Sequence, residues 1–162
     1  MPLGNLFSSK PELEVLKLEN DQSYSVAELH SLLFRRGWDE AECSSLLAQN
    51  SVFGFYARPI DRKNLHGFVL SRVVADEAEI LSIGTDETLQ KKGIGWRLMQ
   101  AAIGEASQRG AEKMFLEVDE NNIPAVRLYQ KIGFQTVGKR EAYYDNGGET
   151  RSNALVLELK LH

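Results

Sequence analysis

The sequence predicts a single α/β domain with a mixed sheet, and three observations support this fold class. The 162 residues suffice for one domain with a buried core. Hydrophobic residues make up 43% of the chain and charged residues 26%, as in an ordinary globular protein. The hydrophobic pattern changes period and gives the order strand, two helices, three strands, helix, strand, helix, two strands. We assign residues 1–162 to this domain and expect 1–10 to be flexible.

The first third of the chain is predicted to hold one strand and two helices. Alternating apolar residues predict the strand over residues 13–18. Apolar residues at helical spacing predict a helix over 24–34, with Ser25 as its N-terminal cap. A second helix is predicted over 39–49, and Asp39 is the residue that caps it.

The middle of the chain is rich in strand patterns. Three strands are predicted, at 51–57, 65–74 and 78–85. The polar residues between the first two strands are typical of a hairpin turn, and a shorter turn at 76–77 precedes the third.

The last part of the chain alternates helices with strands. Glycine ends both helices, which are predicted over 94–108, before Gly110, and over 123–132, before Gly133. Asn122 caps the second of them. The remaining three strands are predicted at 113–119, 135–144 and 153–161, with a turn at 145–148 between the last two.

Composition argues against several classes of protein. Nineteen Lys and Arg against 23 Asp and Glu give a net charge of −4, which disfavours broad nucleic-acid binding and permits a cationic substrate. Cys43 is the single cysteine, so an internal disulfide is excluded, and three scattered histidines form no zinc pattern. No apolar run is long enough to span a bilayer, and no signal-peptide pattern is present. We expect a cytoplasmic protein without metal, nucleic-acid or membrane partners.

A segment rich in glycine and lysine joins the strand at 78–85 to the helix at 94–108. Gly93 and Gly95 let the backbone approach a ligand closely. The start of the helix offers unpaired N–H groups and a positive dipole end to an anion. The spacing fits neither the Walker A motif nor the dinucleotide-binding motif. On the residues alone, a phosphate site and a tight structural turn both stay open.

Several motifs in register resemble the GCN5-related N-acetyltransferase (GNAT) family. Gln90-x-x-Gly93-x-Gly95 matches the motif with which that family binds the pyrophosphate of acetyl-coenzyme A (acetyl-CoA). The second half of the chain is similar to the RimI type, which acetylates the N-terminal alanine of a ribosomal small-subunit protein. The motifs that carry this likeness are Phe115-Leu116-Glu117-Val118, Asn121-Asn122, Ala125-Val126-Arg127-Leu128-Tyr129, Gly133-Phe134 and Gly138-x-Arg140-x-x-Tyr143-Tyr144. The resemblance is strong over residues 80–161 and looser over 24–75.

The resemblance implies a GNAT fold. This is a bent mixed sheet of about seven strands, with four helices on its two faces and a splay between the fourth and fifth strands that holds acetyl-CoA. Strand backbone would pair with the pantetheine arm, and the glycine-rich segment would wrap the pyrophosphate. The implied coenzyme-binding residues are Ile83, Gly84, Thr85, Gln90, Lys91, Lys92, Gly93, Ile94, Gly95, Trp96 and Asn122.

Two residues take catalytic roles in the same resemblance. Glu117 matches the general base, which must take a proton because only a neutral amine has the lone pair for attack. Its alternative is a solvated strand carboxylate, since Leu116 and Val118 face the other side. Tyr129 matches the general acid that protonates the leaving thiolate, and its alternative is a core aromatic residue at helical spacing. We favour the catalytic interpretation for both.

The acceptor side is less defined. The resemblance suggests that Trp38, Asp119, Tyr143 and Tyr144 line a peptide slot, although each also fits an ordinary structural role. An acidic rim could attract a basic substrate or could simply be solvated, and both readings stay open. Its members are Asp76, Glu77, Glu79, Asp86, Glu87, Glu117, Asp119 and Glu120.

The sequence also departs from the family pattern. Thr85-Asp86-Glu87 stands where Val-x-Pro is common, lysines replace arginines in the loop, and Trp96 replaces a basic residue at the helix start. These changes bear on coenzyme affinity, whereas Asp119 in place of an arginine bears on the substrate. We predict N-acetylation of a protein N-terminus, with a small amine or another peptide as the alternative acceptor. A non-catalytic coenzyme A-binding regulatory module is the alternative of another class, and we expect a monomer or weak homodimer.

Overall fold

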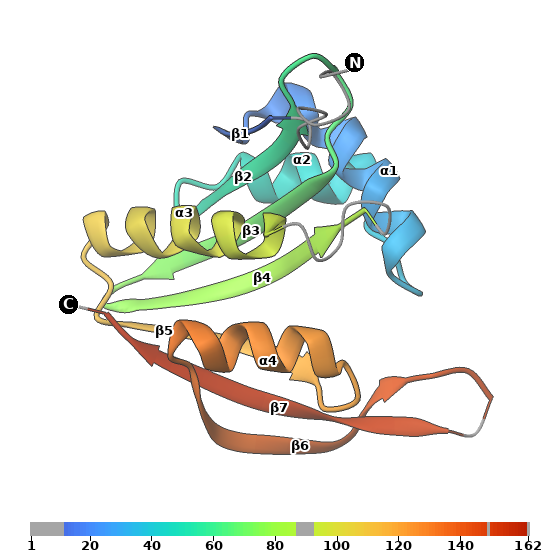
Figure 1. The fold of residues 1–162 in the computed structure, drawn as a ribbon, viewed down its shortest axis with the longest axis vertical. Helices are drawn as coiled ribbons and strands as arrows, with labels where there is room; N and C mark the ends of the chain where they lie inside the picture. The colour runs from blue at the N-terminus through green and yellow to red at the C-terminus, as the bar shows by residue number, and fades with distance from the viewer. Residues whose placement is uncertain (1–11, 87–92, 149, 162) are drawn as a thin grey trace, which may run out of the picture.

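The structure is a computed structural model that describes residues 12–86, 93–148 and 150–161. Its elements follow the predicted order of strands and helices, with one addition, a short 3-10 turn directly before the first helix (Figure 1). The strands are β1 (Leu13–Lys17), β2 (Val52–Pro59), β3 (Gly67–Val74), β4 (Glu77–Thr85), β5 (Lys113–Asp119), β6 (Gln135–Asp145) and β7 (Arg151–Lys160). The helices are η2 (Asn20–Gln22), α1 (Ser23–Leu33), α2 (Glu40–Leu47), α3 (Ile94–Gln108) and α4 (Ile123–Ile132).

All seven strands join one sheet in the order β1-β2-β3-β4-β5-β7-β6. Neighbours run antiparallel except β4 and β5, which are parallel and are connected through α3, as a parallel pair requires. The β4–β5 ladder covers only three pairs, from Glu77 with Lys113 to Glu79 with Phe115. Both strands continue beyond it, and Figure 1 shows them moving apart. The predicted fold class and the splay between the fourth and fifth strands are therefore confirmed.

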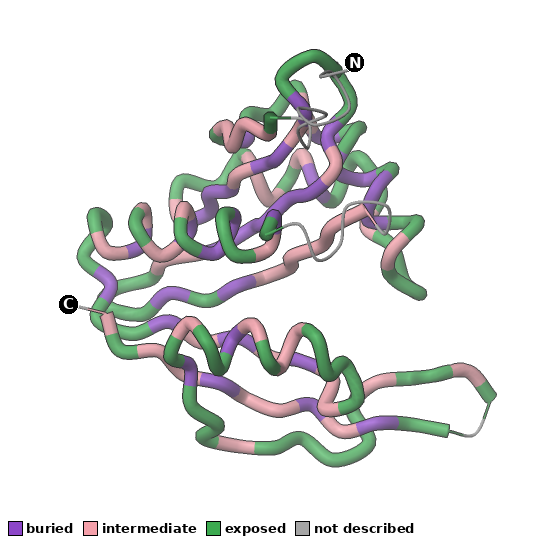
Figure 2. Tube along the Cα trace, viewed as in Figure 1, coloured by how far each residue is buried: buried purple, intermediate pink, exposed green. Residues whose placement is uncertain are grey.

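Helices cover both faces of the sheet and create two hydrophobic cores. On one face, α3 and α4 pack over a core that includes Leu98, Met99 and Leu116. On the other face, α1 and α2 pack over a core that includes Val26 and Phe68. Figure 2 shows the buried residues following the central strands and the inward sides of the helices. Because the apolar residues of β5 alternate toward α3 and α4, Glu117 lies on the opposite face.

Helix ends mostly follow their local signals. Asp39 caps α2 by accepting a hydrogen bond from Glu42 N at 2.8 Å, and Gly133 ends α4 with φ +122°. The predicted cap Ser25 is wrong, because α1 begins two residues earlier. The preceding 3-10 turn is closed by a reciprocal capping box of Glu19 and Gln22, and this turn leads directly into the helix.

Cys43 is a fully buried core residue, as predicted, and burial raises the pKa of its thiol to about 11. Among the described residues, no helix has the length and apolar character needed to cross a membrane.

Candidate active site

The end of β4 forms one wall of the splay. Ile83, Gly84 and Thr85 pair with β3 on one side, while the ladder to β5 stops at Glu79. Gly84 also has a packing role that the sequence did not reveal. A Cβ at this position would lie 2.7 Å from Leu33 Cδ1, so the glycine allows α1 to contact the strand closely.

The first turn of α3 lies beyond this strand. Gly93 is its N-cap, in a left-handed conformation with φ +78°, and among the described residues a Cβ there would meet no atom within 4 Å. Ile94 is buried in the core, Trp96 is 40% exposed, and a Cβ on Gly95 would lie 3.0 Å from Leu128 of α4. The turn thus has an open backbone surface at its N-terminus. Three further residues predicted for this site lie outside the described part of the chain: Gln90, Lys91 and Lys92.

Glu117 meets a partner that sequence reasoning missed. Arg140 Nε of β6 lies 3.0 Å from Glu117 Oε1 and forms an ion pair with it. The Glu117 side chain is 28% exposed, so it is neither buried nor freely solvated. Arg140 was part of a quoted motif, but no role followed from it, because the contact spans three strands of the sheet. The alternative reading of Glu117 as a simple solvated carboxylate is therefore weakened.

Two tyrosines of the predicted site have raised pKa values. Burial, and then the charge of Glu117, raise the pKa of Tyr144 to about 12. Tyr129 of α4 is 6% exposed, and burial followed by the proximity of Tyr144 raises its pKa above the ordinary tyrosine value. The ring of Tyr129 also packs edge-to-face on Phe134, with 5.9 Å between centroids. Glu117, Tyr144 and Tyr129 thus form a chain of electrostatic neighbours, and both phenols keep their protons at neutral pH.

The turn after β5 uses two other predicted site residues structurally. Asp119 Oδ1 accepts from Asn121 N at 2.9 Å, and its Oδ2 accepts from Ser152 Oγ at 2.7 Å. Asn122 caps α4 by accepting from Ala125 N at 3.3 Å. Both side chains are engaged in holding the turn, so their roles toward substrate and coenzyme stay predictions.

Trp38 belongs to an aromatic stack on the α1 side of the sheet. The ring of His30 stacks on Trp38 with 4.4 Å between centroids and on Phe34 with 4.3 Å. Trp38 N donates to His30 Nδ1 at 3.0 Å, which requires an unprotonated nitrogen. Burial lowers the pKa of His30 to about 4, so the ring is neutral at physiological pH. The stack fixes the loop between α1 and α2.

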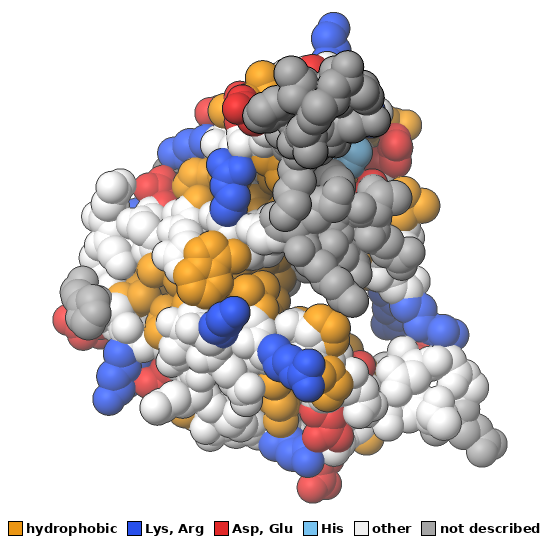
Figure 3. All heavy atoms as spheres, viewed as in Figure 1, with side chains coloured by type: hydrophobic (Ala, Val, Ile, Leu, Met, Phe, Trp, Pro, Cys, Tyr) orange, Lys and Arg blue, Asp and Glu red, His pale blue; other side chains and the backbone are white. Residues whose placement is uncertain are grey.

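The same loop approaches the turn between β6 and β7. A Cβ on Gly147 would lie 2.8 Å from Arg35 Nη1, so the guanidinium rests on this turn. The Gly147 N–H first, and then Arg35 with other arginines, hold the pKa of Asp145 below its usual value. Figure 3 shows Lys or Arg side chains beside the turn at the right of the view. The β6–β7 strands also carry Tyr143, which is 48% exposed.

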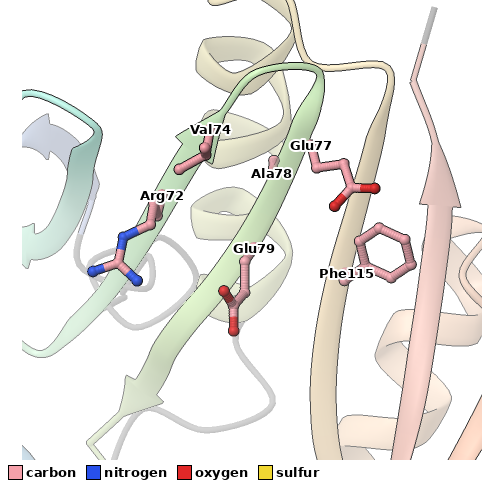
Figure 4. A pocket seen from close by; sticks show the side chains of 6 residues that line it. All are labelled: Arg72, Val74, Glu77, Ala78, Glu79 and Phe115. Atoms are coloured by element: carbon pink, nitrogen blue, oxygen red, sulfur yellow. The ribbon is translucent and has the colours of Figure 1, made fainter.

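A shallow pocket lies where β4 and β5 are still paired. Figure 4 shows its lining: Arg72, Val74, Glu77, Ala78, Glu79 and Phe115. Two of the predicted acidic residues, Glu77 and Glu79, are in this wall together with the cation of Arg72. Steering of a basic substrate by the acidic rim stays a prediction. In the described ranges, no group of three or more His, Cys, Asp or Glu side chains is arranged to hold a metal ion.

Comparisons with known proteins agree with this fold. The family model described as "Acetyltransferase (GNAT) family" matches residues 14–134. The [ribosomal protein bS18]-alanine N-acetyltransferase of Haemophilus ducreyi is 30% identical over 101 residues, which are 62% of this chain and 70% of that protein. The protein of that name from Escherichia coli K12 is 33% identical over 94 residues, 58% of this chain and 63% of that protein, which is less than two thirds of its length.

Solved structures of acetyltransferases have a similar fold. The crystal structure of the E. coli ribosomal-protein-S18-alanine N-acetyltransferase matches with a TM-score of 0.83 at 25% identity, over 93% of this chain and 94% of that chain. Arabidopsis thaliana NAA60 in complex with acetyl-CoA matches with a TM-score of 0.81 at 19% identity, over 92% and 98%, and supports the fold. The match to the family model covers most of the sequence, and the chain belongs to the GNAT family of N-acetyltransferases.

Proposed function

We propose that this protein transfers the acetyl group of acetyl-CoA to the α-amine of a protein N-terminus, and that its acceptor is the N-terminal alanine of a ribosomal protein in the cytoplasm. The observation that carries this proposal is the place of Glu117 on β5, beyond the point where β5 leaves β4, in an ion pair with Arg140. The names of the similar H. ducreyi and E. coli proteins support the choice of acceptor.

The residues present fit acetyl-CoA as co-substrate. Gly93, which has no described atom near the place of a Cβ, caps a helix of 15 residues, so the first N–H groups of α3 and its dipole suit the pyrophosphate. The end of β4, at Ile83, Gly84 and Thr85, would hold the pantetheine arm through its backbone. The fold neighbour NAA60 was solved with acetyl-CoA, which supports the assignment. When bound, acetyl-CoA supplies the acetyl group as a thioester.

Glu117 acts as the base in this proposal. An α-amine has a pKa of about 8, so a modest base acting directly or through a water suffices to provide the neutral form. Arg140 engages Oε1 of the carboxylate and fixes the orientation of the side chain. Oε2 is then the oxygen that receives the proton.

Tyr129 acts as the acid. Its raised pKa ensures that the hydroxyl carries a proton when the thiolate leaves, and burial of the ring holds the hydroxyl in place. Donation from this hydroxyl stabilises the developing negative charge on sulfur. Tyr144 interacts electrostatically with both the base and the acid.

The experiment measures thiol release from acetyl-CoA with an Ala-Arg-initiated basic peptide, the same peptide with a blocked N-terminus, and a set of small amines. We expect turnover only with the free peptide. In Glu117→Gln, kcat should fall by at least about a hundredfold, as expected for loss of a general base, while coenzyme binding persists. Turnover on a small amine instead would show that the acceptor is a small amine and not a protein N-terminus. Coenzyme binding without turnover in the wild type would favour the non-catalytic module, and no binding would refute the proposal.

A further inference from the structure

The pairing of β6 with β7 is interrupted next to the proposed base. Arg140 pairs with Ala154, and Tyr144 pairs with Ser152. Between these pairs, β6 contains residues 141–143 while β7 contains only Asn153. The chain therefore forms a bulge in which three residues face one, and such irregularities are common beside active sites.

The bulge changes which side chains share a face. In a regular strand, residues three positions apart point to opposite faces of the sheet. Here, however, the guanidinium of Arg140 lies over the ring of Tyr143, with 5.3 Å to the centroid. Ala142 makes this possible by adopting φ +52°, a left-handed backbone conformation that residues other than glycine rarely adopt. The bulge thus brings Arg140, the ion-pair partner of Glu117, against Tyr143, whose ring packs on that of Tyr144 with 5.1 Å between centroids.

The side chain of Asn153 holds this conformation. Its Oδ1 accepts from Ala142 N at 2.8 Å, and its Nδ2 donates to Glu120 Oε1 at 2.8 Å. The backbone of Asn153 also accepts from Glu120 N at 3.0 Å. Lys139 Nζ lies 3.1 Å from the other carboxylate oxygen of Glu120. Asn153 therefore ties the strained residue of β6 to the end of β5, three residues beyond the proposed base.

We infer that Asn153 is a positioning residue for the acceptor side of the active site. Its amide fixes the bulge, and the bulge in turn directs Arg140 onto Glu117 and places Tyr144 beside that carboxylate. The coenzyme-binding elements, the end of β4 and the start of α3, are not connected to this network by the contacts described. The kinetic part of the inference rests on the proposed function, whereas its spectroscopic part does not.

The kinetic test compares wild type with Asn153→Ala. We expect kcat/KM for the acceptor peptide to fall about tenfold, equivalent to about 1.4 kcal/mol, mainly through KM, with the Kd of acetyl-CoA unchanged. Adding Ala142→Gly should restore most of the loss, because glycine adopts the left-handed conformation without the anchor. Asn20→Ala is the matched control. It removes an amide that accepts from Ser23 Oγ and Ser44 Oγ at the far end of α1, and should leave the kinetics unchanged.

The spectroscopic test follows the Arg140 Nε–H resonance by NMR, assigned with Arg140→Lys. In wild type it should be shifted and protected from exchange by Glu117. In Asn153→Ala it should move toward the position of a solvated arginine, and Ala142→Gly should return it. Thermal unfolding of each variant separates this local change from loss of the fold. An unchanged resonance in folded Asn153→Ala would overturn the inference. A wild type without turnover on peptides would refute only the proposed function.

Discussion

Substitution of Gly84 by alanine tests how α1 is seated on the splayed end of β4. The added methyl group would lie 2.7 Å from Leu33 Cδ1 and 3.1 Å from Phe68 Cε1. Leu33 can change rotamer, but Phe68 is fully buried and cannot yield without disturbing the α1 core. Overpacking of this kind costs about 1–3 kcal/mol. The lower entropy of the unfolded alanine chain offsets about 0.4–1 kcal/mol, so the net destabilisation should be about 1–2 kcal/mol.

The assay is thermal unfolding, read against Gly104→Ala. For a chain of this length, each 1 kcal/mol changes Tm by about 2–4 °C, so Gly84→Ala should lower Tm by about 2–8 °C. Gly104 lies inside α3, where an added Cβ would meet nothing within 4 Å. There alanine should stabilise the helix by about 0.5–1 kcal/mol. The same glycine-to-alanine change should therefore lower the stability at position 84 and raise it at position 104.

The clash itself can be isolated with a second change. Leu33→Ala removes the atom nearest the new methyl group, so the double variant should be more stable than the sum of the two single effects. A Gly84→Ala protein as stable as wild type, or a strictly additive double variant, would show that α1 does not rest on β4 as described.

Three further outcomes are expected. Tyr129→Phe should lower kcat by about a hundredfold in a thiol-release assay while the Kd of acetyl-CoA is kept; an unaltered kcat would return Tyr129 to a core role. Arg140→Gln should raise KM for the acceptor but change the unfolding free energy by less than about 1 kcal/mol, because its ion pair with Glu117 is partly exposed. His30 has a folded pKa near 4, below its unfolded value of 6.5, so the folded state binds fewer protons and stability falls as pH drops from 6.5 to 4. Urea unfolding should show a loss approaching about 3 kcal/mol that is absent in His30→Gln, which still offers Trp38 an acceptor.

Elements governed by local signals were predictable from the sequence. The bounds of α3, α4 and β5 agree with the prediction, because Asn122 and the glycines at 93, 110 and 133 mark the helix ends by their own chemistry. Ser25 failed as a cap because Ser23 is already bound to Asn20 of the preceding turn, at 2.9 Å between the two oxygens. A competing local turn, rather than the capping preference of serine, decided where the helix begins.

Contacts that depend on strand order were not predictable. Arg140 and Glu117 meet because β7 lies between β5 and β6, an arrangement that reverses the chain order of the last two strands. Periodicity assigns faces within one strand but does not identify its neighbours. The role of Asn153 was hidden for a related reason, since a bulge shifts the register that alternation assumes. The proposed catalytic roles came from the family resemblance, and the structure adds the ion pair of Arg140 with Glu117.

Two of the irregularities of the sheet fall on either side of the strand that carries the proposed base. On one side, the ladder from β5 to β4 stops at Phe115; on the other, beyond β7, the ladder to β6 is broken opposite Asn153. In a continuous sheet, regular alternation would send Tyr143 to the face opposite Arg140. Departures from local rules persist where function offsets their cost, and Ala142 is such a departure. Glu117 lies between these two interruptions, as the proposed role of this carboxylate would require.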